Sequence, residues 1–203
     1  MVHLYARLWG RLILLASGVK VRVRGLERVQ GKGPFIFMSN HLSAYDIFSL
    51  LAYLPFQFRW LAKAELFRIP ILGWAMRAAG YIPIDRSNPR RALRSMEEAA
   101  KRIREGVSVV VFPEGTRSRD GKLGPFRKGG FSLAIKAKVP VVPTAIKGTF
   151  EIMPPQSKRL MRRGTVYIVL GEPIETEGLT MRDRDELMTK VREGIEKGLR
   201  EVA

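Results

Sequence analysis

Short apolar segments that resemble strands alternate along this chain with longer segments that resemble helices. The strand candidates are 19–24, 34–38, 58–62, 81–85, 108–112, 141–146 and 165–170. The helix candidates are 43–54, 70–79, 87–106, 130–136 and a last helix from residue 180. At 203 residues the chain can form one good core. The alternation therefore predicts an α/β fold: a single domain, residues 19–203, with a mostly parallel or mixed central sheet flanked by helices. The segments 19–24 and 81–85 read as strands at or near a sheet edge, the second because of Pro83.

Residues 1–18 are the second region of the chain, and their pattern is that of an amphipathic helix. His3, Arg7 and Arg11 recur every four residues and form one polar stripe, while Leu and Trp side chains cover much of the remaining surface. A helix of this length measures roughly 24 Å, short of the ~30 Å hydrocarbon core of a bilayer. We predict a helix that associates with a membrane surface; the alternative is a helix packed on its own domain.

The charge of the chain calls for an anionic partner. Thirty-six Lys and Arg residues face 19 Asp and Glu, a formal net charge of +17, which suits nucleic acid, anionic lipid or a phosphorylated substrate. The basic residues are scattered and no recognition motif is present, so we expect no nucleic-acid partner. The absence of Cys excludes disulfides, thiolate metal sites and an acyl-cysteine intermediate.

A second apolar and basic cluster lies between residues 56 and 80. Its apolar members are Phe56, Phe58, Trp60, Phe67, Ile69, Ile71, Leu72 and Trp74, and its basic members are Arg59, Lys63, Arg68 and Arg77. Some of these aromatic side chains must belong to the core. The others are a second candidate for contact with lipid.

His41 is the one histidine that follows a predicted buried strand, the position where α/β folds place ligand-binding groups. Asp46 lies five residues on, so the two side chains can meet only if His41 is in the turn before the helix. An Asp bound to one imidazole nitrogen leaves the other free to take a proton from a hydroxyl. The alternative is that Asp46 only completes a capping box with Ser43.

Two further strands end at an arginine. Phe112-Pro-Glu-Gly-Thr-Arg-Ser118 leaves the strand 108–112 and turns on a glycine, and the segment 80–86 ends at Arg86. Arg is suited to a bidentate grip on phosphate. The alternative for 112–118 is an ordinary solvated loop.

Together these segments resemble the four sequence blocks of the glycerolipid acyltransferases of the PlsC type, in the family's order. Within that family the bacterial 1-acylglycerol-3-phosphate acyltransferases are the nearest match. The matching blocks are Asn40-His41-x4-Asp46, Gly80-x-Ile-x-Ile-x-Arg86, Phe112-Pro-Glu-Gly-Thr-Arg-Ser118 and Val139-Pro-Val-Val-Pro-Thr-Ala-Ile146.

The resemblance implies a role for each matching residue. His41 is the general base that deprotonates the acceptor hydroxyl, and Asp46 orients it. The residues implied to bind the acceptor's glycerol phosphate are Arg86, Glu114, Gly115, Thr116 and Arg117, and we add Lys128 from its place in a basic loop.

The implied reaction is transfer of a fatty acyl chain to the free hydroxyl of 1-acyl-sn-glycerol 3-phosphate (lysophosphatidic acid), giving phosphatidic acid. Acyl-CoA or acyl-ACP is the co-substrate, with no other cofactor and no metal, and acyl carrier protein is a partner if it is the donor. An alternative acceptor is another lysophospholipid or glycerol 3-phosphate, and a hydrolase could use the same His-Asp pair. We expect peripheral or monotopic attachment to the cytoplasmic face of the cell membrane, at an anionic surface.

Overall fold

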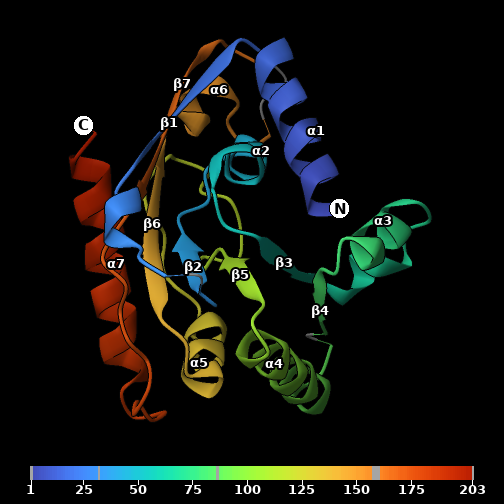
Figure 1. Ribbon diagram of the computed structural model, residues 1–203, viewed down its shortest axis with the longest axis vertical. Coiled ribbons are helices and arrows are strands. Elements are labelled where there is room, and N and C mark those ends of the chain that lie inside the picture. The colour runs from blue at the N-terminus through green and yellow to red at the C-terminus, as the bar shows by residue number, and fades with distance from the viewer. Residues whose placement is uncertain (1, 32, 86, 157–160, 203) are drawn as a thin grey trace.

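The computed structural model describes residues 2–31, 33–85, 87–156 and 161–202. Its centre is a seven-stranded sheet with the order β1-β7-β6-β2-β5-β3-β4, shown in Figure 1. The strands are β1 (Val19–Arg24), β2 (Ile36–Ser39), β3 (Phe58–Lys63), β4 (Ile82–Ile84), β5 (Ser108–Val111), β6 (Val141–Lys147) and β7 (Gly164–Leu170). The α-helices are α1 (Val2–Ala16), α2 (Tyr45–Tyr53), α3 (Leu72–Ala78), α4 (Pro89–Arg104), α5 (Lys128–Ala137), α6 (Thr149–Ile152) and α7 (Arg184–Arg200).

The sheet is mixed but mostly parallel, which confirms the fold class. β6, β2, β5, β3 and β4 run in one direction, each paired in parallel with its neighbour. β7 is antiparallel to β6, and β1 is parallel to β7. The expected edge positions of β1 and β4 are also confirmed. Pro83 lies in β4, where a strand has one unpaired side and a missing N–H is tolerated.

Helices cover both faces of the sheet, with α7, α5 and α4 on one side and α2 and α1 on the other (Figure 1). β2 shows how alternation builds this three-layer core. Ile36 and Met38 belong to the cluster under α4, α5 and α7, whereas Phe37 belongs to the cluster under α1 and α2. All three are fully buried, as expected for a central parallel strand.

The N-terminal helix α1 packs with one face on α2 and leaves the other exposed. Leu14 is buried in the core, and the Ser17 hydroxyl lies 2.7 Å from the Tyr45 hydroxyl. Gly10 lets the helices approach closely, because a Cβ there would lie 3.1 Å from the carbonyl oxygen of Phe48. One side of α1 is therefore part of the domain's core, and its other side is an exposed apolar surface. Within the described residues, no helix combines the length and apolar character that crossing a bilayer requires.

Several element boundaries differ from the sequence expectation. α5 begins at Lys128, and α7 begins at Arg184 rather than near Thr180. The cause at α7 is local: the Asp183 carboxylate accepts hydrogen bonds from the Thr180 N–H (2.7 Å) and hydroxyl (2.8 Å), which closes a turn ahead of the helix. The sequence did not predict α6 or the two 3-10 segments, η1 (Leu26–Arg28) and η2 (Ala64–Arg68).

Candidate active site

The carboxyl ends of β6, β2, β5, β3 and β4 share one edge of the sheet because these strands are parallel. The turn after β2 carries His41, and α2 begins at Tyr45. His41 Nδ1 lies 2.8 Å from Asp46 Oδ2, and the Asp46 side chain is fully buried. The structure therefore places His41 in the turn and Asp46 in the first turn of the helix, the only arrangement in which residues of this spacing can meet.

Asp46 also caps the turn. The same Oδ2 atom accepts hydrogen bonds from the backbone N–H groups of Leu42 (2.6 Å) and Ser43 (2.8 Å). The capping interpretation and the catalytic interpretation of Asp46 are thus both compatible with one geometry. The three donors fix the carboxylate, so the carboxylate in turn fixes the imidazole.

Asn40 anchors this turn to the neighbouring strand. Its side-chain amide donates to the carbonyl of Ile146 (2.8 Å), and its side-chain oxygen accepts from the N–H of Ile146 (2.7 Å). Asn40 is buried, so the pair of hydrogen bonds satisfies groups that water does not reach. The sequence resemblance included Asn40 but gave it no role; its role here is to hold His41 against β6.

Glu114 joins the loop after β5 to the turn after β2. Its Oε1 accepts the N–H of His41 (2.8 Å), and its Oε2 accepts the N–H of Gly124 (2.7 Å). Because both oxygens bind backbone N–H groups of the chain itself, Glu114 is a positioning residue; contact with substrate stays a prediction. Burial raises the pKa of Glu114, and the two N–H groups partly offset this by lowering it. A second link runs from the N–H of Ser118 to the carbonyl of His41 (2.8 Å).

The imidazole of His41 is also held by stacking. The ring centroids of His41 and Phe112 are 3.9 Å apart, with an interplanar angle of 11°. Phe112 stacks in turn on Trp60, with centroids 5.5 Å apart and an interplanar angle of 20°. The His41 side chain is 14% exposed. Its Nδ1 is occupied by Asp46, and Nε2 has no hydrogen-bond partner among the described residues. Nε2 is therefore the atom available to accept a proton.

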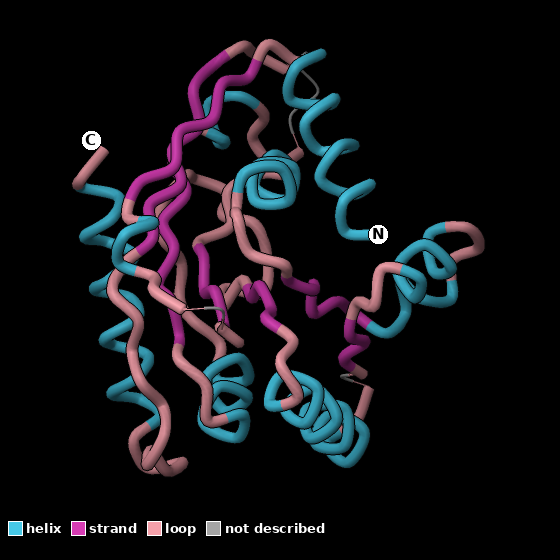
Figure 2. The backbone as a smooth tube through the Cα atoms, in the orientation of Figure 1, coloured by secondary structure: helices cyan, strands magenta, loops and turns pink. Residues whose placement is uncertain are grey.

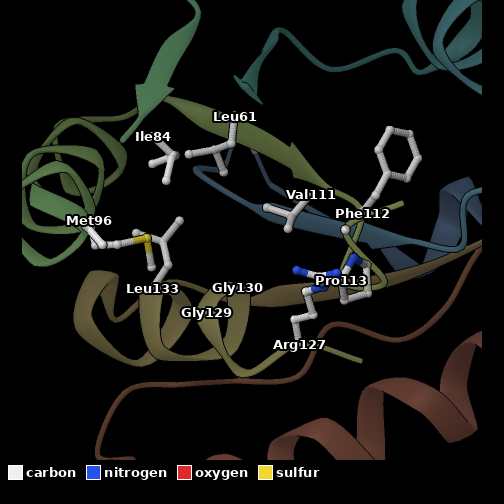
Figure 3. Close-up of a pocket in the computed structure, with 12 residues that line it drawn as sticks. Leu61, Ile84, Met96, Val111, Phe112, Pro113, Arg127, Gly129, Gly130 and Leu133 are labelled. Atoms are coloured by element: carbon white, nitrogen blue, oxygen red, sulfur yellow. The ribbon is translucent and has the colours of Figure 1, made fainter. Parts of the chain in front are cut away.

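A pocket of about 280 Å³ opens beside this site, between the sheet and the helices α4 and α5. Figure 3 shows Arg127 rising beside Pro113 at one end and Met96 with Leu133 at the other. Phe112, the stacking partner of His41, connects the pocket to the imidazole. The lining is mainly apolar and comprises Leu61, Ile84, Ala92, Met96, Val111, Phe112, Pro113, Gly115, Arg127, Gly129, Gly130 and Leu133.

The other predicted substrate-binding residues differ in their position relative to the pocket. Gly115 lines it with a φ of 72°, but its N–H closes the turn by donating to the Phe112 carbonyl (3.0 Å). Thr116 and Arg117 are exposed next to it. Arg86 lies outside the described residues. The loop thus brings Gly115 to the pocket, with Thr116 and Arg117 next to it, and the side chains of these two form no hydrogen bond or ion pair with the described residues.

Lys128 turns away from the pocket, and its neighbour Arg127 takes that position. The Lys128 amine lies 3.4 Å from the Asp185 carboxylate on α7, and the side chain is 58% exposed. Arg127 lines the pocket, and its side chain lies against Gly115, where an added Cβ would be 2.9 Å from Arg127 Cδ. The sequence assigned no role to Arg127. Its sequence signal is its place in Phe126-Arg-Lys-Gly-Gly130, a basic segment that also resembles the glycerolipid acyltransferases.

Metal ligands are not assembled in the part of the chain that the structure describes. There, no three or more His, Cys, Asp or Glu side chains come together as a possible metal site.

Known proteins are similar to this chain in sequence and in fold. A family model described as Acyltransferase matches residues 20–147. A chloroplastic 1-acyl-sn-glycerol-3-phosphate acyltransferase of Brassica napus is 39% identical over 173 residues, 85% of this chain and 50% of that protein. The alpha form of the same enzyme from Mus musculus is 34% identical over 198 residues, 95% of this chain and 70% of that protein.

One solved structure has the same architecture over nearly the whole chain. It is the crystal structure of the 1-acyl-sn-glycerophosphate acyltransferase PlsC from Thermotoga maritima, with a TM-score of 0.84 and 31% identity over 98% of this chain and 79% of that one. The chain spans about half the length of the Brassica napus relative. The match of the family model over residues 20–147, with these identities, establishes that the chain belongs to the acyltransferase family.

Proposed function

We propose that the protein transfers a fatty acyl chain from an acyl thioester to the free hydroxyl of 1-acyl-sn-glycerol 3-phosphate, giving phosphatidic acid. The observation that carries the proposal is the 2.8 Å contact between His41 Nδ1 and Asp46 Oδ2 beside an apolar pocket. The choice of acceptor is supported by the relatives that are 34–39% identical, which are 1-acyl-sn-glycerol-3-phosphate acyltransferases.

His41 acts as the general base in this proposal. Its Nε2 takes the proton from the acceptor hydroxyl while the hydroxyl oxygen attacks the thioester carbonyl carbon. The new C–O bond forms, the C–S bond breaks, and the leaving thiolate takes the proton back from the imidazolium. Asp46 holds the ring in place and stabilises the imidazolium that forms between the two steps.

Direct transfer is favoured over a covalent acyl-enzyme. The chain contains no Cys and no Gly-x-Ser-x-Gly motif, so a nucleophile of either kind is missing from the sequence. The thioester itself supplies the driving force. Acyl-CoA or acyl-ACP is then the only co-substrate needed, and acyl carrier protein is a partner in the second case.

Three arginines, Arg117, Arg127 and Arg86, bind the phosphate of the acceptor in this proposal. Arg117 and Arg127 come from two segments that meet at Gly115, and Arg86 follows β4 in the sequence. A guanidinium binds phosphate oxygens in a bidentate manner, stronger than a neutral hydrogen bond. The apolar walls of the pocket are suited to an acyl chain.

The exposed face of α1 attaches the protein to the anionic cytoplasmic face of the cell membrane as a peripheral or monotopic protein. Its exposed apolar side chains are Leu4, Tyr5, Leu8, Trp9, Leu12 and Leu15. Deletion of residues 1–18 is a poor test because Leu14 and Gly10 of α1 cover α2. Replacing Leu4, Leu8 and Leu15 with Ser keeps that packing, and we expect it to weaken binding to anionic vesicles while thermal unfolding stays unchanged.

The reaction is tested by incubating the protein with acyl-CoA and a panel of acceptors, followed by lipid analysis. The panel contains lysophosphatidic acid, lysophosphatidylcholine and glycerol 3-phosphate. We expect phosphatidic acid from lysophosphatidic acid as the dominant product. A dominant product from another acceptor would support the related acyltransferase instead, and thioester consumption without an acylated lipid would indicate a hydrolase.

A further inference from the structure

The exposed apolar surface of the protein is concentrated on two segments. Among the described residues, fifteen large apolar side chains are exposed; six lie on α1, and five lie on the connection between β3 and β4. These five are Leu66, Ile69, Ile71, Leu72 and Trp74. We call residues 64–78 the α3 segment. A concentration of exposed apolar side chains marks a surface that contacts a partner.

The α3 segment is a built structure that directs these side chains outward. Figures 1 and 2 show it projecting from the β4 end of the sheet. Phe67 and Met76 fill its interior, and Gly73 packs so closely that an added Cβ would lie 2.2 Å from the Phe67 carbonyl oxygen. Arg77 Nη1 donates to the same carbonyl (2.7 Å). The inner side of the segment is therefore tightly packed, and the Phe67 carbonyl has a hydrogen-bond donor.

The outer side carries Ile71 and Trp74, which are 76% and 66% exposed. Ile71 has a φ of 64°, a conformation that is rarely adopted by a β-branched residue. The turn thus holds a large aliphatic side chain at the start of α3, away from the core. Trp at such a position is typical of the interface between lipid headgroups and acyl chains.

The charge around the α3 segment is complementary to an anionic surface. Lys63, Arg68 and Arg77 are exposed there, against one acidic residue, Glu65. Residues 56–80 contain four Lys and Arg but only one acidic residue. Basic residues near an anionic leaflet contribute about 1 kcal/mol each to membrane binding. A protein partner for this surface would need no such excess of positive charge, whereas an anionic leaflet is attracted by it.

The beginning of α1 and the α3 segment lie at opposite ends of one strand, β3. The His3 ring contacts Phe58 at the start of β3 edge-on, with centroids 5.2 Å apart, so the beginning of α1 lies there. The α3 segment begins directly after Lys63, the last residue of β3. Six residues of extended chain measure roughly 20 Å. The surfaces are therefore close enough to meet the same patch of membrane.

We propose that the α3 segment is a second membrane-binding element, which inserts Ile71, Leu72 and Trp74 into the same anionic leaflet as α1. The proposal rests on the membrane attachment proposed above and is independent of the acyl-transfer chemistry. The segment connects β3 to β4, the strands that contribute Leu61 and Ile84 to the apolar pocket. Insertion at this point places the leaflet beside the pocket wall, so an acyl chain travels a short distance between the two.

The three tryptophans of the chain allow a direct test. Trp9 lies on α1 and Trp74 on the α3 segment, while Trp60 is buried in the core. The Trp9→Phe protein reports on Trp74, the Trp74→Phe protein reports on Trp9, and the double variant gives the Trp60 background. Each is mixed with phosphatidylglycerol vesicles whose acyl chains carry bromine, a contact quencher, and with neutral phosphatidylcholine vesicles as the comparison.

We expect brominated phosphatidylglycerol to quench the Trp74 emission of the Trp9→Phe protein well beyond the double variant. Quenching of Trp9 alone would overturn the α3 proposal and leave attachment through α1 intact. Quenching of neither would contradict both. A dimer seen by light scattering without vesicles, with Trp74 shielded in it, would assign the surface to a second copy of the chain and also overturn the proposal.

The vesicle affinities of two matched variants test the proposal independently of fluorescence. Ile71→Ser with Leu72→Ser removes apolar surface from the α3 segment, while Leu93→Ser removes a 51% exposed leucine from α4. We expect the first protein to bind phosphatidylglycerol vesicles about tenfold or more weakly and the second to bind normally. Equal vesicle affinity of both proteins and the unaltered chain would reject the α3 segment as a membrane contact.

Discussion

Glu114 accepts a hydrogen bond from the backbone N–H of His41 at 2.8 Å, across a sequence separation of 73 residues. With its other oxygen it binds the N–H of Gly124 at 2.7 Å. The carboxylate thus fixes the turn that carries the base relative to the loop that carries the arginines. Two sequence blocks far apart in the chain become one rigid site through this side chain.

Replacing this carboxylate with an amide tests its positioning role. In Glu114→Gln one of the two N–H groups loses its acceptor, because the amide NH2 cannot accept a hydrogen bond, and such a loss in a buried site costs about 1–3 kcal/mol. We expect the free energy of unfolding in urea to fall by about that amount and turnover to fall with it. Glu98→Gln, at an exposed position on α4, is the control. Unchanged stability and turnover in Glu114→Gln would remove Glu114 from the site.

Asp46→Asn separates the charge of Asp46 from its geometry. Oδ2 accepts all three hydrogen bonds, and Oδ1 has no partner among the described residues. Asn can therefore place its NH2 at the Oδ1 position and keep the contacts. We expect a folded protein with kcat reduced strongly, but less than in His41→Ala, because the imidazolium loses its counter-charge. Thermal unfolding and steady-state kinetics measure the two effects, and wild-type turnover would contradict the proposed role.

The arginines at the pocket mouth are expected to act on the acceptor rather than the donor. Charged hydrogen bonds are worth about 1.5–3 kcal/mol each, so Arg117→Ala should lower kcat/KM for lysophosphatidic acid about ten- to a hundredfold. The sequence resemblance predicts the same loss for Arg86→Ala. The lining position of Arg127 predicts the same for Arg127→Ala. Arg182→Ala, which removes an equal charge near the start of α7, is the control. A raised KM for the thioester with unchanged acceptor kinetics would assign these arginines to the donor.

His3 predicts a pH-dependent stability. Burial, with smaller contributions from the charges of Arg59 and Arg7, lowers the pKa of His3 from 6.5 to about 4. Between these values the unfolded chain binds a proton that the folded chain excludes, so this contribution to stability is complete above pH 6.5 and is lost as the pH falls toward 4.

Urea unfolding at pH 7 and pH 5 tests the assignment. We expect the loss of stability between these pH values to be smaller in His3→Gln than in the unaltered protein. His41 and the carboxylates are common to both proteins, so their titration cancels in the comparison. An identical loss in the two proteins would show that His3 does not titrate as its burial requires.

The sequence was sufficient to predict the fold class and the possibility of a contact between His41 and Asp46. Alternation of strands and helices predicted a mostly parallel sheet, and the spacing of His41 and Asp46 allowed contact only across a turn, which is what the structure contains. The choice between a capping and a catalytic Asp46 could not be made from sequence. The reason is physical: the same oxygen, Oδ2, contacts the His41 imidazole and accepts the backbone N–H groups that cap the turn.

The arrangement of the loop after β5 could not be predicted because it depends on distant residues. Lys128 turns outward toward Asp185, which comes from α7, 57 residues later. Adjacent basic residues carry no sequence signal that decides between them, so Arg127 was missed. Likewise, the positioning role of Glu114 depends on hydrogen bonds to His41 and Gly124, which only the folded chain brings next to its carboxylate.

The central claim is that His41 is the general base for transfer to the acceptor hydroxyl. The most direct measurement is the rate of phosphatidic acid formation from saturating lysophosphatidic acid and acyl-CoA by folded His41→Ala protein. His3→Ala, which replaces the other of the two histidines, is the matched control. We expect His41→Ala to lose about 10²–10⁴-fold or more in rate while His3→Ala keeps most of it. Near-normal phosphatidic acid formation by His41→Ala would contradict the mechanism.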